Sequence, residues 1–302
     1  MKMIKLQYII LSCLIIQGCG DSFSTIIEID PPEFESQLSV TGFVNSGEPL
    51  INLEVGRNLS ILTDSDAADF AVDGAFVSIT KMSSGIEVNS VSNIDPSVTR
   101  EGRFILVFPD TNFIEEGESY TFLVEHPDFE NSETTLLCPE EGAVLSNLRY
   151  NREGGLLSDF EEASSISFDI TDFGENSGYY QLSGRVMRQG VLSSTFNMES
   201  TDPIAQKAFP RDDIFISDDT FDGETRTLTI RFRRFFFIPE VDDYIELTLA
   251  SISEGTFNFS RSLERFDATN GVPFASPVQV TSNVNNAQGN IGLATQTRYI
   301  VE

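Results

Sequence analysis

The sequence predicts an all-β protein built from antiparallel strands, with one short helix near the C-terminus. Apolar residues alternate with polar ones over many short stretches, and Gly-containing breaks separate these stretches. The 302 residues include 25 Phe, which supply ample apolar surface for a core. Apolar residues at 40 % and charged residues at 22 % are typical of a folded chain rather than a disordered one.

The first residues have the layout of a secretory signal peptide. Lys2 and Lys5 precede an apolar run over residues 6–16. This run is shorter than the roughly 20 residues that a membrane-spanning helix needs. We therefore expect residues 1–18 to be a cleaved signal peptide.

The end of this segment, Ile16-Gln17-Gly18-Cys19, resembles the lipobox of bacterial lipoproteins. The resemblance implies acylation of Cys19 and anchoring of the chain in a membrane by its lipid. The alternative is an ordinary signal peptide with an incidental cysteine. Gly20 follows Cys19, so the adjacent aspartate that retains lipoproteins in the inner membrane is missing. This favours the outer membrane, at the cell surface or on the periplasmic face, with residues 19–35 as a lipidated tether.

Residues 36–138 are predicted to form an antiparallel β-sandwich of about seven strands, of the immunoglobulin-like or transthyretin-like type. The run Phe104 to Phe108 is apolar on both faces and predicts a central strand. The alternating strands are marked by Leu38/Val40, Ile51/Leu53/Val55, Ala75/Val77/Ile79 and Tyr120/Phe122/Val124.

Residues 139–302 are predicted to form a second β-rich domain, because Cys138-Pro139-Glu140-Glu141-Gly142 is a composition break typical of a linker. Phe259, Leu263 and Phe266 recur at helical spacing, with Ser253 as a cap and Asn270-Gly271 as a stop. The strands are expected at Ile166/Phe168/Ile170, Tyr179 to Met187, Asp213 to Ser217, Thr225 to Phe237, Tyr244 to Ile252, Pro277 to Thr281 and Ile291 to Val301.

Two segments resemble a known family. Leu38-Ser39-Val40-Thr41-Gly42-Phe43-Val44 is similar to the opening strand of the Bacteroidota lipoproteins known as domain of unknown function 4249. The helix from Phe257 to Phe266 and the segment from Pro273 to Val284 resemble the end of the same family. The resemblance implies an outer-membrane lipoprotein, often encoded beside TonB-dependent receptors. It implies no catalytic residue.

Four carboxylates around one glycine form a candidate metal site. Asp218, Asp219, Asp222 and Glu224 surround Gly223, and hard oxygen ligands on a tight turn are what Ca²⁺ requires. A solvated acidic hairpin is the alternative. We expect no cofactor unless this cluster holds Ca²⁺. Asp64-Ser65-Asp66 is a weaker candidate of the same kind.

A cationic and aromatic stretch forms a candidate ligand site. Arg231 and Arg233 would share one strand face with Phe235, which offers an anion-binding patch beside an aromatic ring. Charge pairing with acids on neighbouring strands is the alternative.

Several function classes are disfavoured. The net charge of −28 repels nucleic acid phosphates. His126, the one histidine, lies in a turn, and no nucleophile-elbow motif accompanies it, so it predicts no hydrolase triad. Cys138 has no partner if Cys19 is acylated, and it is expected to be a small apolar residue at a strand end.

We therefore expect a non-enzymatic outer-membrane lipoprotein that serves as an accessory or ligand-binding partner of a TonB-dependent transporter. The alternatives are an adhesin or envelope assembly component that acts through protein contacts, and a hydrolase that uses a pair of carboxylates. An exposed apolar patch would favour the adhesin. Two acids about 5 to 9 Å apart in a cleft would favour the hydrolase.

Overall fold

We obtained a computed structural model of the chain, which divides it into two compact units, Met1–Glu35 and Ser36–Glu302. The structure describes residues 34–59, 67–72, 74–90, 102–174, 178–208, 213–238, 243–269, 276 and 278–301. The predicted signal peptide, Cys19 and all of the predicted tether except Phe34 and Glu35 lie outside these residues. Within them, no helix has the length and apolar character required to cross a membrane.

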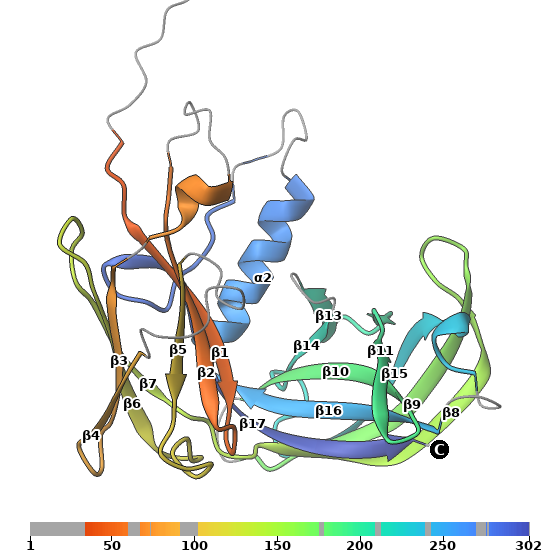
Figure 1. Cartoon of the computed structure of the whole chain (residues 1–302). Helices are drawn as coiled ribbons and strands as arrows, with labels where there is room; N and C mark the ends of the chain where they lie inside the picture. Colours follow the sequence, from red (N-terminus) through yellow and green to blue (C-terminus); the bar gives the residue numbers. More distant parts are fainter. Residues whose placement is uncertain are drawn as a thin grey trace, which may run out of the picture. The chain divides into compact units, whose positions relative to one another are not determined.

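The described part of the second unit is strand-dominated, as the sequence predicts, with a single α-helix near its C-terminus (Figure 1). Its helical segments are η1 (Ala67–Phe70), η2 (Arg234–Phe236) and α2 (Glu254–Thr269). Its strands are β1 (Leu38–Asn45), β2 (Leu50–Arg57), β3 (Phe76–Lys81), β4 (Ile86–Asn89), β5 (Arg103–Val107), β6 (Ser119–Glu125), β7 (Ser132–Leu137), β8 (Ala143–Leu156), β9 (Glu162–Asp172), β10 (Tyr179–Arg188), β11 (Val191–Thr195), β12 (Glu199–Ser200), β13 (Ala205–Ala208), β14 (Asp213–Ser217), β15 (Thr225–Arg233), β16 (Tyr244–Ile252) and β17 (Ala287–Val301).

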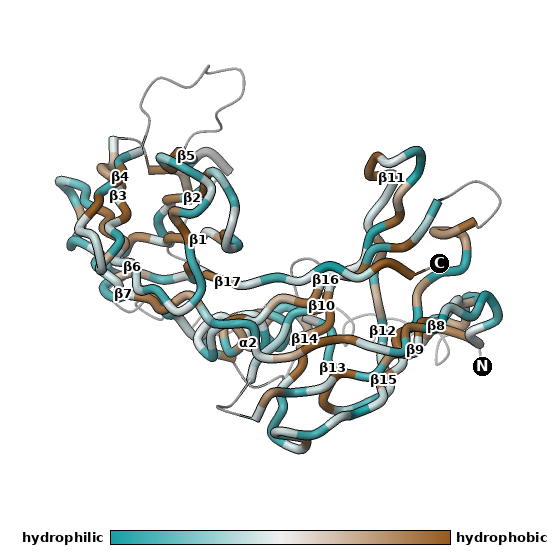
Figure 2. The backbone as a smooth tube through the Cα atoms, turned by 90° about the horizontal axis from the view of Figure 1, so that it is seen from below, coloured by the Kyte–Doolittle hydropathy of each residue, from teal (hydrophilic) through white to brown (hydrophobic). Residues whose placement is uncertain are grey.

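The described strands form three sheets. The long sheet has nine strands in the order β13-β14-β10-β16-β17-β1-β2-β5, with β11 paired to β10. The β3–β6 sheet has the order β4-β3-β6-β7, and the β9–β15 sheet has the order β12-β15-β9-β8. Hydrophobic and hydrophilic stretches interleave along the strands (Figure 2), which is the pattern that the period-two alternation predicts.

The described residues of this unit form two large hydrophobic cores and a smaller cluster around Phe257 of α2. The first core contains Val40, Leu53, Val77 and Phe122, so it joins β1 and β2 to the β3–β6 sheet. The second core contains residues of β10 and β16 together with residues of the β9–β15 sheet. Strand β17 contributes Ile291 and Leu293 to the first core and Val301 to the second. The long sheet therefore belongs to both cores.

One strand pair departs from the antiparallel expectation. β1 pairs with β17 in parallel, from Leu38 opposite Ala287 to Asn45 opposite Ala294. At the start of this pairing Gly289 has a φ of 125°, and a Cβ there would lie 2.1 Å from the Val40 carbonyl oxygen. Glycine is required at this position because the two backbones approach too closely for any side chain.

Three expectations about single strands are wrong. β5 is not central: it ends the long sheet among the described strands, and Val107 is 50 % exposed. β15 ends at Arg233, because the chain turns into the 3₁₀ helix η2. Residues 278–281 form no strand. The Thr281 N–H donates to Ser262 Oγ of α2 at 2.9 Å, so a helix side chain rather than a sheet holds this segment.

The helix forms where it was predicted, but it buries a different face. The Thr256 N–H donates to Ser253 Oγ at 3.2 Å, which confirms Ser253 as the N-cap. Phe257 is buried against Phe215, Ala250 and Ala294 of the long sheet, whereas Phe266 is exposed. The expected stop at residues 270–271 lies outside the described residues.

Candidate functional site

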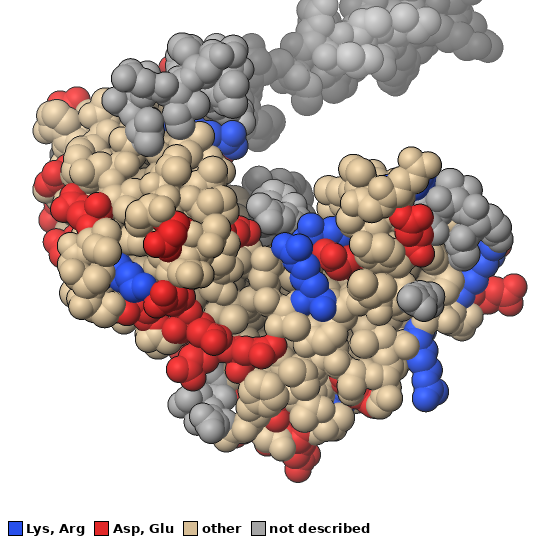
Figure 3. Space-filling model, turned by 60° about the horizontal axis from the view of Figure 1, so that its bottom comes forward, with Lys and Arg blue, Asp and Glu red and all other residues tan. Residues whose placement is uncertain are grey.

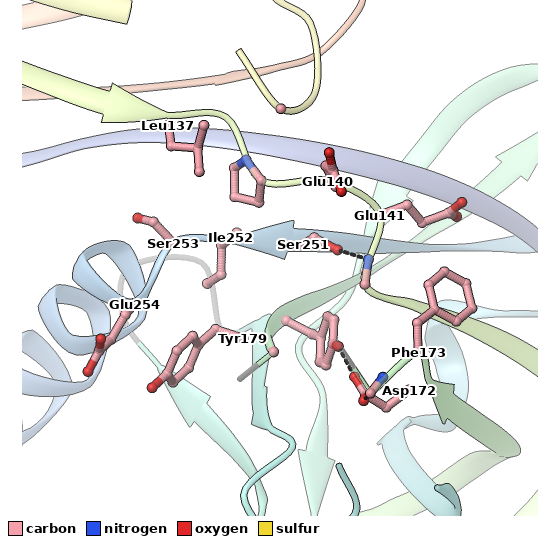
Figure 4. A pocket seen from close by; sticks show the side chains of 16 residues that line it. Leu137, Glu140, Glu141, Asp172, Phe173, Tyr179, Ser251, Ile252, Ser253 and Glu254 are labelled. Atoms are coloured by element: carbon pink, nitrogen blue, oxygen red, sulfur yellow. Dashed lines mark hydrogen bonds between the residues drawn. The ribbon is translucent and has the colours of Figure 1, made fainter. Parts of the chain in front are cut away.

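The described residues line a pocket of about 970 Å³ (Figure 4). Its walls come from the segment between β7 and β8, the end of β9, the start of β10 and the connection from β16 to α2. We call it the linker pocket, because the residues predicted as an interdomain linker form one wall. It is lined by Gly117, Leu137, Pro139, Glu140, Glu141, Gly142, Asp172, Phe173, Gly174, Gly178, Tyr179, Tyr180, Ser251, Ile252, Ser253 and Glu254.

Hydrogen bonds hold the linker wall, residues 139–142, against the long sheet. Thr295 Oγ1 donates to the Pro139 carbonyl at 2.6 Å, and Thr297 Oγ1 donates to the Glu141 carboxylate. The Gly142 N–H donates to Ser251 Oγ at 2.9 Å. These bonds fix Pro139 to Gly142 against β16 and β17, so the segment is a pre-formed wall and not a loose connection.

The linker pocket is acidic. Glu140, Glu141, Asp172 and Glu254 line it, and none of its described lining residues is Lys, Arg or His. Figure 4 shows Glu254 and Glu140 on opposite sides of the pocket. On the face drawn in Figure 3, acidic side chains gather in a continuous patch, in keeping with the net charge of −28. Such a field attracts cations and repels anions.

Aromatic rings add an apolar surface to the acidic lining. Phe173 is about half exposed, and the ring of Tyr179 packs on Phe257 with 4.9 Å between ring centroids. Burial, and next the charge of Glu254, raise the pKa of Tyr179, so its hydroxyl stays protonated and can donate. Carboxylates beside exposed aromatic faces are the groups that bind organic cations.

Three carboxylates meet beside this pocket. One oxygen each of Asp172, Asp218 and Asp222 lie within 4.8 Å of one another, which is a spacing that one cation could bridge. The sequence predicts Asp218 and Asp222, together with Asp219 and Glu224. It misses Asp172 at the end of β9, because that residue comes from a distant strand. Asp219 and Glu224 do not join the group.

The hydrogen bonds of Asp172 show a structural role for this cluster. Asp172 accepts from the Tyr180 hydroxyl and from the N–H groups of Gly174 at 2.7 Å and Gly223 at 2.8 Å. A Cβ at Gly174 would lie 2.6 Å from the Gly223 Cα, so the two turns touch. Asp172 thus connects the segment after β9 to the turn before β15 through hydrogen bonds to both.

Asp218 is the buried member of the cluster. Its carboxylate accepts from the Gly178 N–H at 2.5 Å, and its side chain is inaccessible to solvent. Burial is the main cause that raises its pKa, and the charges of Asp172 and Asp222 add to the shift. The Ca²⁺ prediction for this cluster remains a prediction.

The predicted arginine site lies elsewhere, on β15 and η2. Arg233 forms ion pairs with Asp159 at 2.8 Å and Glu161 at 3.0 Å, from the turn between β8 and β9. Arg231 lies opposite Glu199 in the register of β12 and β15. Phe235 leaves the strand face and is exposed on η2. The prediction of ligand binding for Arg231, Arg233 and Phe235 stays untested.

His126 and Cys138 belong to neither the linker pocket nor the carboxylate cluster. His126 Nδ1 accepts from the Asp128 N–H at 3.1 Å in the turn after β6. Cys138 is completely buried after the end of β7. Burial raises the pKa of its thiol to about 11. Asp64 and Asp66 lie outside the described residues.

Comparison with known proteins identifies one family. The family described as Domain of unknown function (DUF4249) matches residues 24–300. No curated protein matches the chain.

Solved structures resemble the chain only distantly. A DUF4785 family protein from Legionella pneumophila is 10 % identical, with a TM-score of 0.23 over 71 % of this chain and 52 % of its own, so the chain spans about half its length. The yeast delta-COP-I mu-homology domain is 10 % identical, with a TM-score of 0.25 over 90 % of this chain and all of its own. A biofilm-associated protein B domain is 8 % identical, with a TM-score of 0.18 over 87 % and 85 %. Similarity at this level supports no functional conclusion.

Proposed function

We propose that this chain, which belongs to the DUF4249 family, is an outer-membrane lipoprotein that binds a small ligand for a TonB-dependent transporter. In this proposal Cys19 carries the lipid, and the protein performs no catalysis. The transporter setting comes from the family resemblance, and the lipid comes from the lipobox-like sequence before Gly20.

The linker pocket is the observation that carries the binding role. Its volume of about 970 Å³ lies within the usual range of small-molecule sites, about 300 to 1,000 Å³. Four carboxylates and the rings of Phe173 and Tyr179 line it without a described cationic neighbour. The ligand class that fits this lining is an organic cation, such as an amine or a quaternary ammonium compound.

The pocket suits capture and release. Its linker wall is held by hydrogen bonds to β16 and β17, so binding requires little ordering of the backbone. Gly174 and Gly178 contribute to another wall, where the lack of side chains leaves the backbone open to a ligand. A cation held by several carboxylates and rings can dissociate stepwise toward a transporter.

Ligand binding is tested by calorimetry on the lipidated protein in detergent micelles, with choline, spermidine and arginine as probes. We expect at least one probe to bind, and Glu254→Gln to weaken its binding about tenfold, which corresponds to about 1.4 kcal/mol. Glu87→Gln on the exposed strand β4 is the matched control and should bind as the wild type does. Equal binding by wild type and Glu254→Gln would exclude the linker pocket.

The partner is tested by a mild-detergent pull-down of the tagged native protein, read by mass spectrometry. We expect a stoichiometric TonB-dependent receptor, and we expect its loss with Cys19→Ala because that variant cannot be acylated. Recovery of the lipoprotein alone would contradict the transporter role.

A second candidate function, adhesion or assembly through protein contacts, has one observation in its favour. Phe160 is 82 % exposed and Phe235 is 61 % exposed. Phe160 is next to Asp159, which pairs with Arg233, and Phe235 follows Arg234, which pairs with Glu162 at the start of β9. The two rings therefore lie at the same end of the β9–β15 sheet. Exposed aromatic side chains beside arginines are typical of contact surfaces. In the same pull-down, Phe160→Ser combined with Phe235→Ser would then release the partner.

A further inference from the structure

Polar side chains share one face of the long sheet, and Figure 1 shows α2 beside that sheet. The strand register of β10, β16 and β17 places their residues in rows across the sheet. Residues that are directly opposite each other share a face, and every second residue along a strand returns to it. The three rows are Gln181–Ala250–Gln296, Ser183–Thr248–Arg298 and Arg185–Glu246–Ile300.

These rows form the floor of a groove. One hollow of about 550 Å³ is lined by the first two rows and Arg185, and a second of about 400 Å³ lies toward α2. The two hollows share Phe43, Gln181 and Asp213, so they are continuous. We call them together the sheet-face groove. It shares no lining residue with the linker pocket.

Two buried polar atoms of this groove have no partner among the described residues. Thr248 is 4 % exposed, and its Oγ1 forms no hydrogen bond. Asn290 is 8 % exposed, and its Oδ1 forms none. Thr248 lines the larger hollow and Asn290 the smaller one. Buried polar atoms are nearly always hydrogen-bonded, so two exceptions in one groove indicate groups that a ligand would satisfy.

The charges of the groove nearly cancel, because Arg103, Arg185 and Arg298 lie among the carboxylates of Glu48, Glu54, Asp213 and Glu246. Arg185 Nε lies 3.1 Å from Glu246 Oε1, and Arg298 Nε lies 4.0 Å from the same oxygen. At the other end, Arg103 Nη2 lies 3.4 Å from Glu54 Oε1. A ligand with a strong charge of either sign would have to displace one of these pairs. The groove therefore fits a neutral ligand.

The polar groups specify the ligand further. The Gln181 amide already donates one N–H to Asp213 Oδ2 at 2.6 Å, and its other N–H and its oxygen can donate and accept further. The Gln296 amide and the hydroxyls of Ser183 and Thr248 can likewise donate and accept. Neighbouring strands lie about 4.8 Å apart, so these groups repeat at short intervals across the floor. A ligand that matches them must both donate and accept at closely spaced atoms, as the hydroxyl groups of a sugar do.

We propose that the sheet-face groove binds a neutral, hydroxyl-rich ligand of the class of short oligosaccharides, through the Ser183–Thr248–Arg298 row. This site lies beyond the proposed organic-cation pocket and does not depend on it.

The test is calorimetry on the lipidated protein in a detergent without a sugar headgroup, because a maltoside would compete. The probes are maltohexaose, cellohexaose, xylohexaose and mannohexaose, with tetragalacturonic acid as the acidic comparison. We expect a neutral probe to bind. Binding of tetragalacturonic acid alone, or of no probe at millimolar concentration, would overturn the proposed ligand class.

Variants assign the binding to the groove. Thr248→Val removes a hydroxyl that has no hydrogen-bond partner among the described residues, so the melting temperature should not fall, while probe binding weakens about two- to tenfold. Arg298→Ala should weaken it at least as much. Thr80→Val, the same change in the β3–β6 sheet, is the control. Unchanged binding by both groove variants would overturn the assignment, even if a sugar binds elsewhere.

Discussion

The thiol of Cys138 is a buried group whose chemistry follows from its surroundings. Its Sγ lies 3.8 Å from Thr295 Oγ1, and burial raises its pKa to about 11. At pH 8 the thiolate fraction falls on the order of 100-fold below that of an ordinary cysteine. We expect the folded, lipidated protein to react with a disulfide reagent at least that much more slowly than the same protein in guanidinium chloride. Equal rates in both conditions would show that Cys138 is accessible.

Asp218 is a buried carboxylate that destabilises the fold at neutral pH. Its pKa in the folded protein is raised above the ordinary 3.8, mainly by burial. Protonation therefore favours the folded state as the pH falls through the raised pKa toward the ordinary value. In EDTA at pH 7 we expect Asp218→Asn to raise the free energy of unfolding by on the order of 1 kcal/mol, and so to unfold at a higher urea concentration than the wild type. An amide oxygen can still accept from the Gly178 N–H.

The pH dependence separates this explanation from a general effect of substitution. The advantage of Asp218→Asn should disappear below about pH 4, where the wild-type carboxyl is also neutral. Asp128→Asn, on the exposed turn after β6, should change stability little at any pH. An advantage that persists at low pH would mean that charge is not its cause. Repeating the measurement in Ca²⁺ tests the cation prediction, because a bound ion would stabilise the wild type more than the variant.

The sequence predicts only part of the carboxylate cluster around Asp218. Asp218 and Asp222 stand close together in the sequence, and their joint position on a turn was predictable. Asp172 comes from the end of β9, and only the contact between the turns of Gly174 and Gly223 brings it near. No spacing in the sequence encodes that contact. The Tyr179 and Glu254 walls of the linker pocket were unpredictable for the same reason.

Among the secondary-structure elements, α2 owes its start to a single side chain. Ser253 Oγ accepts from the Thr256 N–H, which satisfies one of the unpaired donors of the first turn. We expect Ser253→Ala to reduce the free energy of unfolding by about 1 kcal/mol in urea titration. Ser253→Thr retains a capping oxygen and should retain most of the stability. Equal loss in both variants would indicate that packing in the linker pocket, rather than capping, is the role of this residue.

The strands show which part of the fold the sequence encodes locally. β6 alternates over Tyr120, Phe122 and Val124, and all three are buried as the period predicts. In contrast, the run Phe104 to Phe108 predicts a central strand, but β5 lies at the end of the long sheet among the described strands, because apolar character does not report the number of neighbouring strands. Residues 278–281 follow a strand-like pattern, yet their partner is a helix side chain. The local sequence therefore predicts that a segment is a strand, but it does not predict which segments lie beside it.

For the unit Ser36–Glu302 as a whole, the sequence could not reveal that both cores share one sheet. The composition break after Cys138 predicts two domains, 36–138 and 139–302, and that division stays a prediction. β17 supplies side chains to both cores and pairs with β1 on one side and β16 on the other. A parallel pairing between the first strand and the last has no local signature, since nothing near either strand in the sequence specifies the other.

This shared strand predicts how the unit unfolds. Loss of the first core would remove the packing of Ile291 and Leu293, and β17 would then no longer support β16 in the second core. We therefore expect one cooperative transition in urea, with hydrogen exchange of β3 and of β9 following the same midpoint. Val77→Ala in the first core and Leu228→Ala in the second should each reduce the free energy of unfolding by about 1 to 3 kcal/mol. Each variant should therefore move that common midpoint to a lower urea concentration. If Val77→Ala instead lowers the midpoint of β3 and leaves that of β9 unchanged, the two cores are independent domains, as the composition break alone would suggest.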